Sequence, residues 1–140
     1  MSDALKPTAE QSAALAALPA DGPVVMINLL QFKKPGGLER YLRYGQEVAP
    51  LMERAGATIR YAGFTHAVIL GDGQPPWWDA IVVVEYPSPT AFSDMVTSKD
   101  YAQIYEHRAA AIDRGDLIAT SRWPAQRNPQ NSATAKGNLQ

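Results

Sequence analysis

Two polar side chains stand where the surrounding pattern is apolar. Asn28 interrupts the apolar run of residues 24–30, and Arg108 falls on the same stripe of a predicted helix as Tyr101 and Ile104. An unpaired buried polar group costs about 1–3 kcal/mol, so each needs partners. In a cleft beside a sheet, Asn28 and Arg108 could anchor the carbonyl, enolate or carboxylate of a small molecule, with Tyr101 in the same binding site. Alternatively, Asn28 fastens the strand to a neighbouring element, and Arg108 pairs with a carboxylate or with carbonyl groups.

The candidates for proton transfer lie in the middle of the chain. His66 follows Gly63, where we expect an irregular strand, and such irregularities often re-aim side chains toward a site. Asp79 follows Trp77 and Trp78 at the start of the next strand. Neighbouring residues of an extended chain point to opposite faces, so one tryptophan can pack in the core while the other lines a pocket or the dimer seam, and Trp78 is the candidate site residue. Asp79 could instead tie the strand start to a nearby loop.

These side chains suggest functions of two different classes. In the first, Asn28 and Arg108 hold a carbonyl group while His66 or Asp79 moves a proton, so that an enolisable compound is isomerised or oxygenated without a cofactor. In the second, the protein is a non-catalytic dimer that binds a metabolite or has a structural role. Asn28 and Arg108 are then structural groups.

The composition excludes several other chemistries. The 140 residues contain no cysteine and two histidines, so disulfides, thiolate catalysis and Cys-ligated or three-His metal sites are excluded. The net charge of −1 gives no electrostatic reason to expect nucleic acid as a partner. No apolar segment approaches the ~18 residues of a membrane span, and the first residues do not read as a signal peptide. We therefore expect a cytoplasmic protein that needs no metal or cofactor and has no membrane partner.

Two apolar runs, residues 24–30 and residues 80–86, indicate how the sheet is covered. A sheet with one face in water shows strict alternation of apolar and polar residues, whereas these runs each contain one polar residue. Both faces of the sheet therefore need cover. The chain has enough predicted helix for one face, so we expect a second copy to cover the other face in a homodimer.

The helices are predicted from their caps and periodicity. Thr8 and Gln11 have the capping-box spacing of a short first helix. Apolar residues three and four apart predict a second helix over residues 38–55, bent at Pro50 and capped by Gly56. Ser88 and Ser98 are expected to cap two further helices.

The strands complete an α+β fold. We expect them at residues 24–30, residues 58–70 with an irregularity near Gly63, residues 79–86 and residues 116–123. With the helices, their order is βαββαβ preceded by one helix, which is the ferredoxin-like pattern. The predicted units are an N-terminal helical extension (residues 1–22), a ferredoxin-like domain (residues 23–124) and a mobile polar tail (residues 125–140).

Several short motifs occur together in one order and spacing. They are Gly56-Ala57, Gly63, Gly71, Trp78-Asp79, Tyr86-Pro87-Ser88, Phe92, Ser98-Lys99-Asp100-Tyr101 and Arg108, with Met-x-Asn-Leu-Leu-x-Phe at Met26 to Phe32. Over about 100 residues, from Val24 to Trp123, the chain resembles the domain of unknown function 1330 family.

The resemblance implies membership of the dimeric α+β barrel superfamily. There, two sheets pack face to face across a two-fold axis, as the apolar runs independently suggest. The family has no agreed activity, so the resemblance assigns no residue a role. Members of the superfamily include cofactor-free monooxygenases, isomerases, dehydratases and haem enzymes, and the fold alone does not select one of them.

Overall fold

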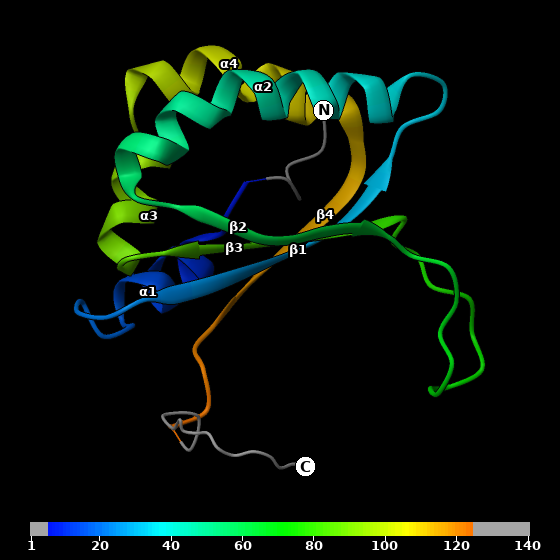
Figure 1. The fold of residues 1–140 in the computed structure, drawn as a ribbon, viewed down its shortest axis with the longest axis horizontal. Helices are drawn as coiled ribbons and strands as arrows, with labels where there is room; N and C mark the ends of the chain where they lie inside the picture. Colours follow the sequence, from blue (N-terminus) through cyan, green and yellow to red (C-terminus); the bar gives the residue numbers. More distant parts are fainter. Residues whose placement is uncertain (1–5, 125–140) are drawn as a thin grey trace.

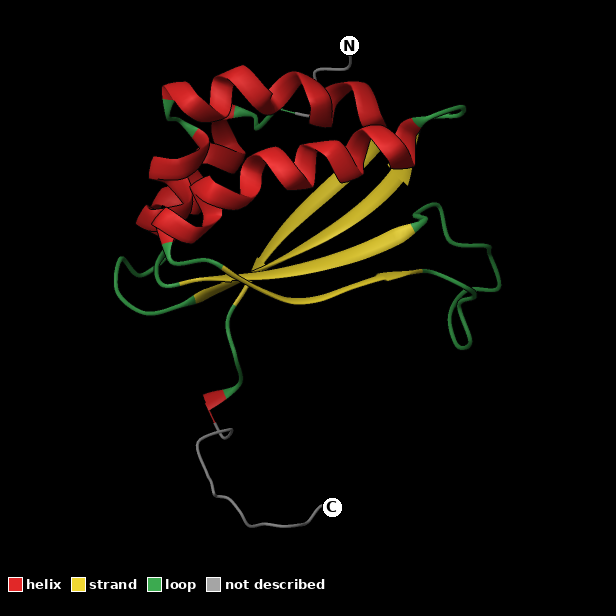
Figure 2. Ribbon diagram, turned by 45° about the horizontal axis from the view of Figure 1, so that its top comes forward, coloured by secondary structure: helices red, strands yellow, loops and turns green. Residues whose placement is uncertain are grey.

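The computed structural model describes residues 6–124, which form a four-stranded antiparallel sheet with helices packed on one face (Figures 1 and 2). The elements in chain order are α1 (Ala9–Ala16), β1 (Val24–Phe32), α2 (Gly37–Ala55), β2 (Thr58–Phe64), β3 (Ala80–Tyr86), α3 (Pro89–Val96), α4 (Lys99–Ala111) and β4 (Ile112–Thr120). This order confirms the predicted ferredoxin-like α+β fold. The predicted tail, residues 125–140, lies outside the described residues.

The predicted helix caps are present. The Thr8 hydroxyl accepts a hydrogen bond from the Gln11 backbone N–H, and the Gln11 side-chain oxygen accepts one from the Thr8 backbone N–H. Gly56 ends α2 with a positive φ of 77°, which a residue without Cβ adopts at low cost. Ser88 and Ser98 cap α3 and α4 through their hydroxyl groups.

The strand order β2-β3-β1-β4 places β1 in the middle of the sheet, paired with β3 and β4. Residues of β1 alternate in burial. Val24, Met26, Asn28 and Leu30 face the helices and are buried. The main core forms where this face of β1 meets Tyr44 and Val48 of α2, Met95 of α3 and Tyr101 of α4, and Leu15 and Leu18 pack against it from the N-terminal segment.

The other surface of the sheet, which we call the open face, is not covered by the helices of the chain. Its central residues are Val25, Ile27 and Leu29 of β1. On the neighbouring strands, Val83 and Ile81 of β3 pair with Ile27 and Leu29, and Ile118 of β4 pairs with Ile27. Tyr61 of β2 pairs with Val83 and extends the face by one more strand. The β1 and β3 members are half-buried, while Tyr61 and Ile118 are 56% and 44% exposed. Helices of the chain therefore cover one apolar face of the sheet, and no helix within residues 6–124 covers the open face.

Two strands differ from their predicted bounds by more than two residues. β2 ends at Phe64, which pairs with Ala80, the first residue of β3. Residues 66–70 follow β2, and their strand partner would have to be the segment just before β3. That segment contains prolines, so residues 66–70 do not continue the strand. The irregularity lies at Arg60 and not near Gly63, because Ile59 and Tyr61 pair with the consecutive residues Val84 and Val83. Residues 65–79 form a long connection, which we call the arm.

β4 begins at Ile112, four residues before its predicted start, and ends at Thr120. The backbone changes from helix at Ala111 to extended at Ile112, with φ −125° and ψ 142°, and no loop lies between them. Ile112 pairs with Phe32 at the end of β1. The sequence holds no turn signal at this junction, so the periodicity of α4 hides the start of the strand.

Candidate functional site

The candidate site is a polar cluster between the middle of the sheet and the two long helices. Asn28 projects from β1 toward the helices, and Arg108 comes from the last turn of α4. The Arg108 guanidinium donates from Nη2 to the Asn28 Oδ1 over 3.5 Å, a long bond, while the Asn28 Nδ2 donates to the Val82 carbonyl oxygen over 3.1 Å. Both groups predicted to face inward therefore meet on the helix side of the sheet.

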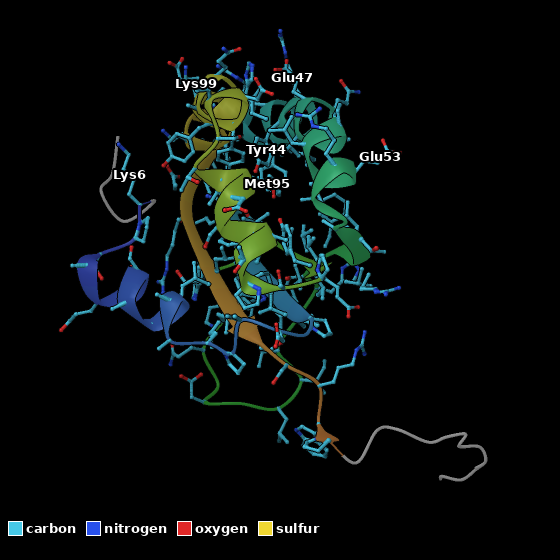
Figure 3. The ribbon with its side chains drawn as sticks, turned by 90° about the vertical axis from the view of Figure 1, so that its left-hand side faces the viewer. Lys6, Tyr44, Glu47, Glu53, Met95 and Lys99 are labelled. Carbon is cyan, nitrogen blue, oxygen red and sulfur yellow. The ribbon has the colours of Figure 1, made fainter. Side chains whose placement is uncertain are left out.

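Tyrosines from both helices surround the guanidinium. Arg108 also bonds to the hydroxyl of Tyr41. The hydroxyl groups of Tyr44 and Tyr101 lie 2.9 Å apart, and the rings of Tyr41 and Tyr44 lie 5.3 Å apart. Figure 3 shows Tyr44 directed inward beneath the helices, whereas Glu47 and Glu53 of the same helix point outward. We call Asn28, Tyr41, Tyr44, Tyr101 and Arg108 the Arg108 cluster.

Tyr41 and Tyr44 were not among the site residues predicted from the sequence. Aromatic residues on the apolar face of an amphipathic helix are ordinary core residues, so their type alone did not indicate a site. The available signal was their spacing of three residues on α2, which places both hydroxyl groups on one side of the helix.

The charges of the cluster follow from its burial. Burial raises the pKa of Tyr44 well above its ordinary value of 10.0, and it raises the pKa of Tyr41 as well. Burial acts to lower the pKa of Arg108, but interactions with the surrounding tyrosines outweigh it and the net shift is upward. Arg108 is therefore a cation beside neutral hydroxyl groups and a neutral amide.

No carboxylate among residues 6–124 forms an ion pair with Arg108. The six ion pairs in this part of the chain involve other basic residues. The cation is consequently compensated only by dipoles within the described structure. Such a group is costly to bury and favours any anion that can reach it.

The wall of the cluster toward β4 is apolar and contains one small residue. Leu30, Ala111 and Ile112 are almost fully buried next to Phe32 and Tyr41. A Cβ atom added at Gly115 would lie 3.5 Å from the Arg108 Nη2 and 2.7 Å from the Ile112 Cδ1. The absence of a side chain at Gly115 therefore lets Ile112 and Arg108 pack closely against the backbone of β4.

The other predicted site residues lie in the arm. The Asp79 Oδ2 accepts a hydrogen bond from the Phe32 backbone N–H over 2.8 Å, and the Asp79 N–H donates to the Leu30 carbonyl oxygen over 2.6 Å. Trp78 is partly buried and packs edge to face against Trp77, with ring centroids 5.5 Å apart. His66 is exposed. The structure thus brings Asn28, Tyr101 and Arg108 together and places His66, Trp78 and Asp79 on a separate segment.

Two absences hold for the described part of the chain. Residues 6–124 contain no group of three or more His, Asp or Glu side chains arranged to hold a metal ion. None of their helices combines the length and apolar character needed to cross a bilayer.

The sheet order and helix layer define the class: this is a ferredoxin-like α+β fold. The chain belongs to the family described as Domain of unknown function (DUF1330), whose pattern matches residues 25–121. The resemblance inferred from the motifs is thereby confirmed.

Solved structures agree with this assignment. The RPA0582 protein of unknown function from Rhodopseudomonas palustris is 30% identical, with a TM-score of 0.74 over 84% of this chain and 95% of its own. Two more distant structures share the fold alone. At3g17210 from Arabidopsis thaliana is 13% identical, with a TM-score of 0.56 over 71% of this chain and 95% of its own. A dimeric ferredoxin-like protein of unknown function from Jannaschia sp. CCS1 is 8% identical, with a TM-score of 0.55 over 72% of this chain and 100% of its own. No curated protein matches the chain.

Proposed function

We propose that this protein binds a small molecule through an anionic oxygen, either a carboxylate or an enolate, at the Arg108 cluster. The observation that carries the proposal is the charged guanidinium between sheet and helices, which bonds to Asn28 and Tyr41 and forms no ion pair with a carboxylate of residues 6–124. A cation in such surroundings attracts an anion strongly, because little water is present to screen it.

The same cluster supports a reaction class. A guanidinium, an amide and neutral hydroxyl groups stabilise the negative oxygen that forms when a proton leaves the carbon next to a carbonyl group. Isomerisation and oxygenation of an enolisable compound both pass through this enolate. We therefore propose a cofactor-free isomerase or monooxygenase, with His66 or Asp79 as the group that moves the proton and Trp78 as a ligand contact.

One observation favours the non-catalytic alternative. The carboxylate of Asp79 already accepts the backbone N–H of Phe32, and His66 is exposed on the arm. A protein that binds its ligand at Arg108 without moving a proton agrees with both facts. The two functions are therefore tested separately.

We further propose that the protein is a homodimer joined through the open face. Ile27 and Val83 lie opposite each other in the middle of this face, and exposed Tyr61 and Ile118 extend it to both sides. An apolar surface of this kind is ordinarily covered in a stable protein, and a two-fold dimer covers both copies at once. The structurally similar Jannaschia protein, described as dimeric, supports the same arrangement.

The binding proposal is tested by thermal unfolding with pyruvate, acetoacetate and benzoate as probes. A ligand at ten times its Kd stabilises the folded protein by about 1.4 kcal/mol. We expect at least one probe to raise the Tm of the parent protein. The same probe should not change the Tm of the Arg108→Met variant. Arg43→Met is the matched control, because Arg43 is 65% exposed and pairs with Glu47 on the surface. An equal Tm shift in the parent and in Arg108→Met would contradict binding at the Arg108 cluster.

The catalytic part is tested by proton exchange in D₂O, followed by NMR at the carbon next to the carbonyl group of acetoacetate. An enolising protein accelerates deuterium uptake over the buffer rate, and Arg108→Met should abolish the acceleration. His66→Ala and Asp79→Asn then show which group moves the proton. Binding without acceleration would support the non-catalytic function instead.

A further inference from the structure

The arm carries the most exposed large apolar side chains in residues 6–124. Ile69 is 90% exposed and Leu70 is 94% exposed, and both are consecutive residues of one segment. Isolated apolar residues on a surface need no explanation, whereas two adjacent aliphatic side chains held out in water are a typical contact with another molecule.

The base of the arm is fastened to the sheet. Backbone and side-chain bonds of Asp79 join it to Leu30 and Phe32 of β1, as described above. The side chain of Gln31 donates to the Trp77 carbonyl oxygen over 3.0 Å, and the Arg114 guanidinium stacks on the Trp77 ring at 3.8 Å from its centroid. These contacts set the direction in which the arm leaves the sheet.

The arm leaves toward the side of the open face. Figures 1 and 2 show it passing beyond the end of β2 and β3 and descending on the side of the sheet opposite the helices. A molecule packed on the open face would therefore lie next to the arm. The arm, which includes Ile69 and Leu70, and the open face therefore lie on the same side of the sheet.

We propose that Ile69 and Leu70 contact a second copy of this chain, so that each arm of the dimer reaches around its partner. The inference rests on the proposed homodimer and adds a second contact region to it. A second copy is the occupant that fits, because the open face is continuous with the side on which the arm lies and because a protein of the same fold is described as dimeric. In a two-fold dimer each arm contact occurs twice, so a small apolar tip contributes disproportionately to assembly.

The test compares Leu70→Ser with Leu42→Ser by sedimentation over a range of protein concentrations. Leu42 is the matched control, since it is 59% exposed but belongs to α2 on the opposite side of the sheet. We expect Leu70→Ser to raise the Kd of the dimer by about tenfold or more, because the leucine contact is lost twice. Leu42→Ser should leave the Kd unchanged. Leu70 is exposed within one chain, so both variants should keep the circular dichroism spectrum of the parent.

A second measurement uses the absence of cysteine from the chain. Leu70→Cys should react with a maleimide more slowly at concentrations where the dimer forms than in dilute solution, while Leu42→Cys should react at one rate throughout. A dimer whose Kd is unaffected by Leu70→Ser and whose Leu70→Cys reacts at one rate would overturn the arm contact alone. A parent that stays monomeric at all concentrations would overturn the homodimer and the arm contact together.

Discussion

The hydroxyl oxygens of Tyr44 and Tyr101 lie 2.9 Å apart in the core, although the two residues are 57 positions apart in the sequence. Their rings meet edge to face, at 87° and with centroids 6.3 Å apart. This pair joins α2 to α4 directly beside Arg108. Because burial keeps Tyr44 protonated, the contact is a neutral hydrogen bond that fixes the helices forming one wall of the candidate site.

Tyr44→Phe should lower the free energy of unfolding by about 1–3 kcal/mol, because it leaves the buried hydroxyl of Tyr101 without this partner. Adding Tyr101→Phe to this variant should lower the free energy of unfolding by less than Tyr44→Phe does, because it removes the hydroxyl that was left without a partner. Urea denaturation of the two single variants and the double variant measures this coupling. Strictly additive losses would show that the two hydroxyl groups do not stabilise each other.

Asp79→Ala should destabilise the protein by about 1–3 kcal/mol, because the Phe32 backbone N–H loses the carboxylate oxygen that it bonds over 2.8 Å. Asp79→Asn retains an acceptor oxygen at the same position and should lose much less. Urea denaturation of both variants gives the difference. If the alanine variant is as stable as the parent, the tie between arm and β1 is not a structural requirement.

Glu85→Gln should make the free energy of unfolding less dependent on pH in the acidic range. Hydrogen bonds from Arg60 and Arg122 lower the pKa of Glu85 below its ordinary value of 4.5. A lowered folded-state pKa adds stability that is complete above the unfolded value and is lost as the pH falls through the folded value. The parent should therefore lose more unfolding free energy than Glu85→Gln between about pH 6 and about pH 3.

The matched control for Glu85 is Glu53→Gln, which changes a carboxylate that points outward from α2 (Figure 3). Its stability should follow the parent over the same pH range. Because Arg60 and Arg122 are 52% and 59% exposed, solvent screening keeps the Glu85 effect small, and urea denaturation at several pH values is needed to measure it. Identical curves for the parent and Glu85→Gln would exclude a contribution from this group.

Ile27→Lys should convert the proposed dimer to a monomer. Ile27 lies in the middle of the open face, so the dimer would bury an unpaired charge twice. Sedimentation at micromolar concentration should give about twice 15.2 kDa for the parent and 15.2 kDa for the variant. Leu42→Lys on α2 should remain dimeric. A parent that sediments at 15.2 kDa would contradict the proposed assembly.

Local pattern was sufficient to predict most of the fold. Caps such as Thr8, Ser88 and Ser98 satisfy backbone groups within a few residues, so their effect is readable from the sequence alone. The period of α2 and the apolar run of β1 show which side chains face inward. That information placed Asn28 and Arg108 on buried faces and ordered the strands and helices correctly.

Pattern failed where an element is defined by a distant partner. The aliphatic residues 68–70 have the composition of a strand, but β2 ends at Phe64 because β3 begins opposite it at Ala80. The start of β4 at Ile112 depends on pairing with Phe32, which is 80 residues earlier in the chain. A strand boundary is a property of two segments, and one segment read alone does not contain it.

The candidate site shows the same division. The sequence by itself determined that an amide in β1 and a guanidinium in α4 point into the interior, because strand and helix periodicity set the direction of each side chain. Only the tertiary structure decided that Tyr41 and Tyr44 surround Arg108 and that Asp79 bonds to Phe32. These contacts depend on how α2 packs against α4 and on how the arm returns to the sheet. Both are set by packing between segments that are distant in the sequence.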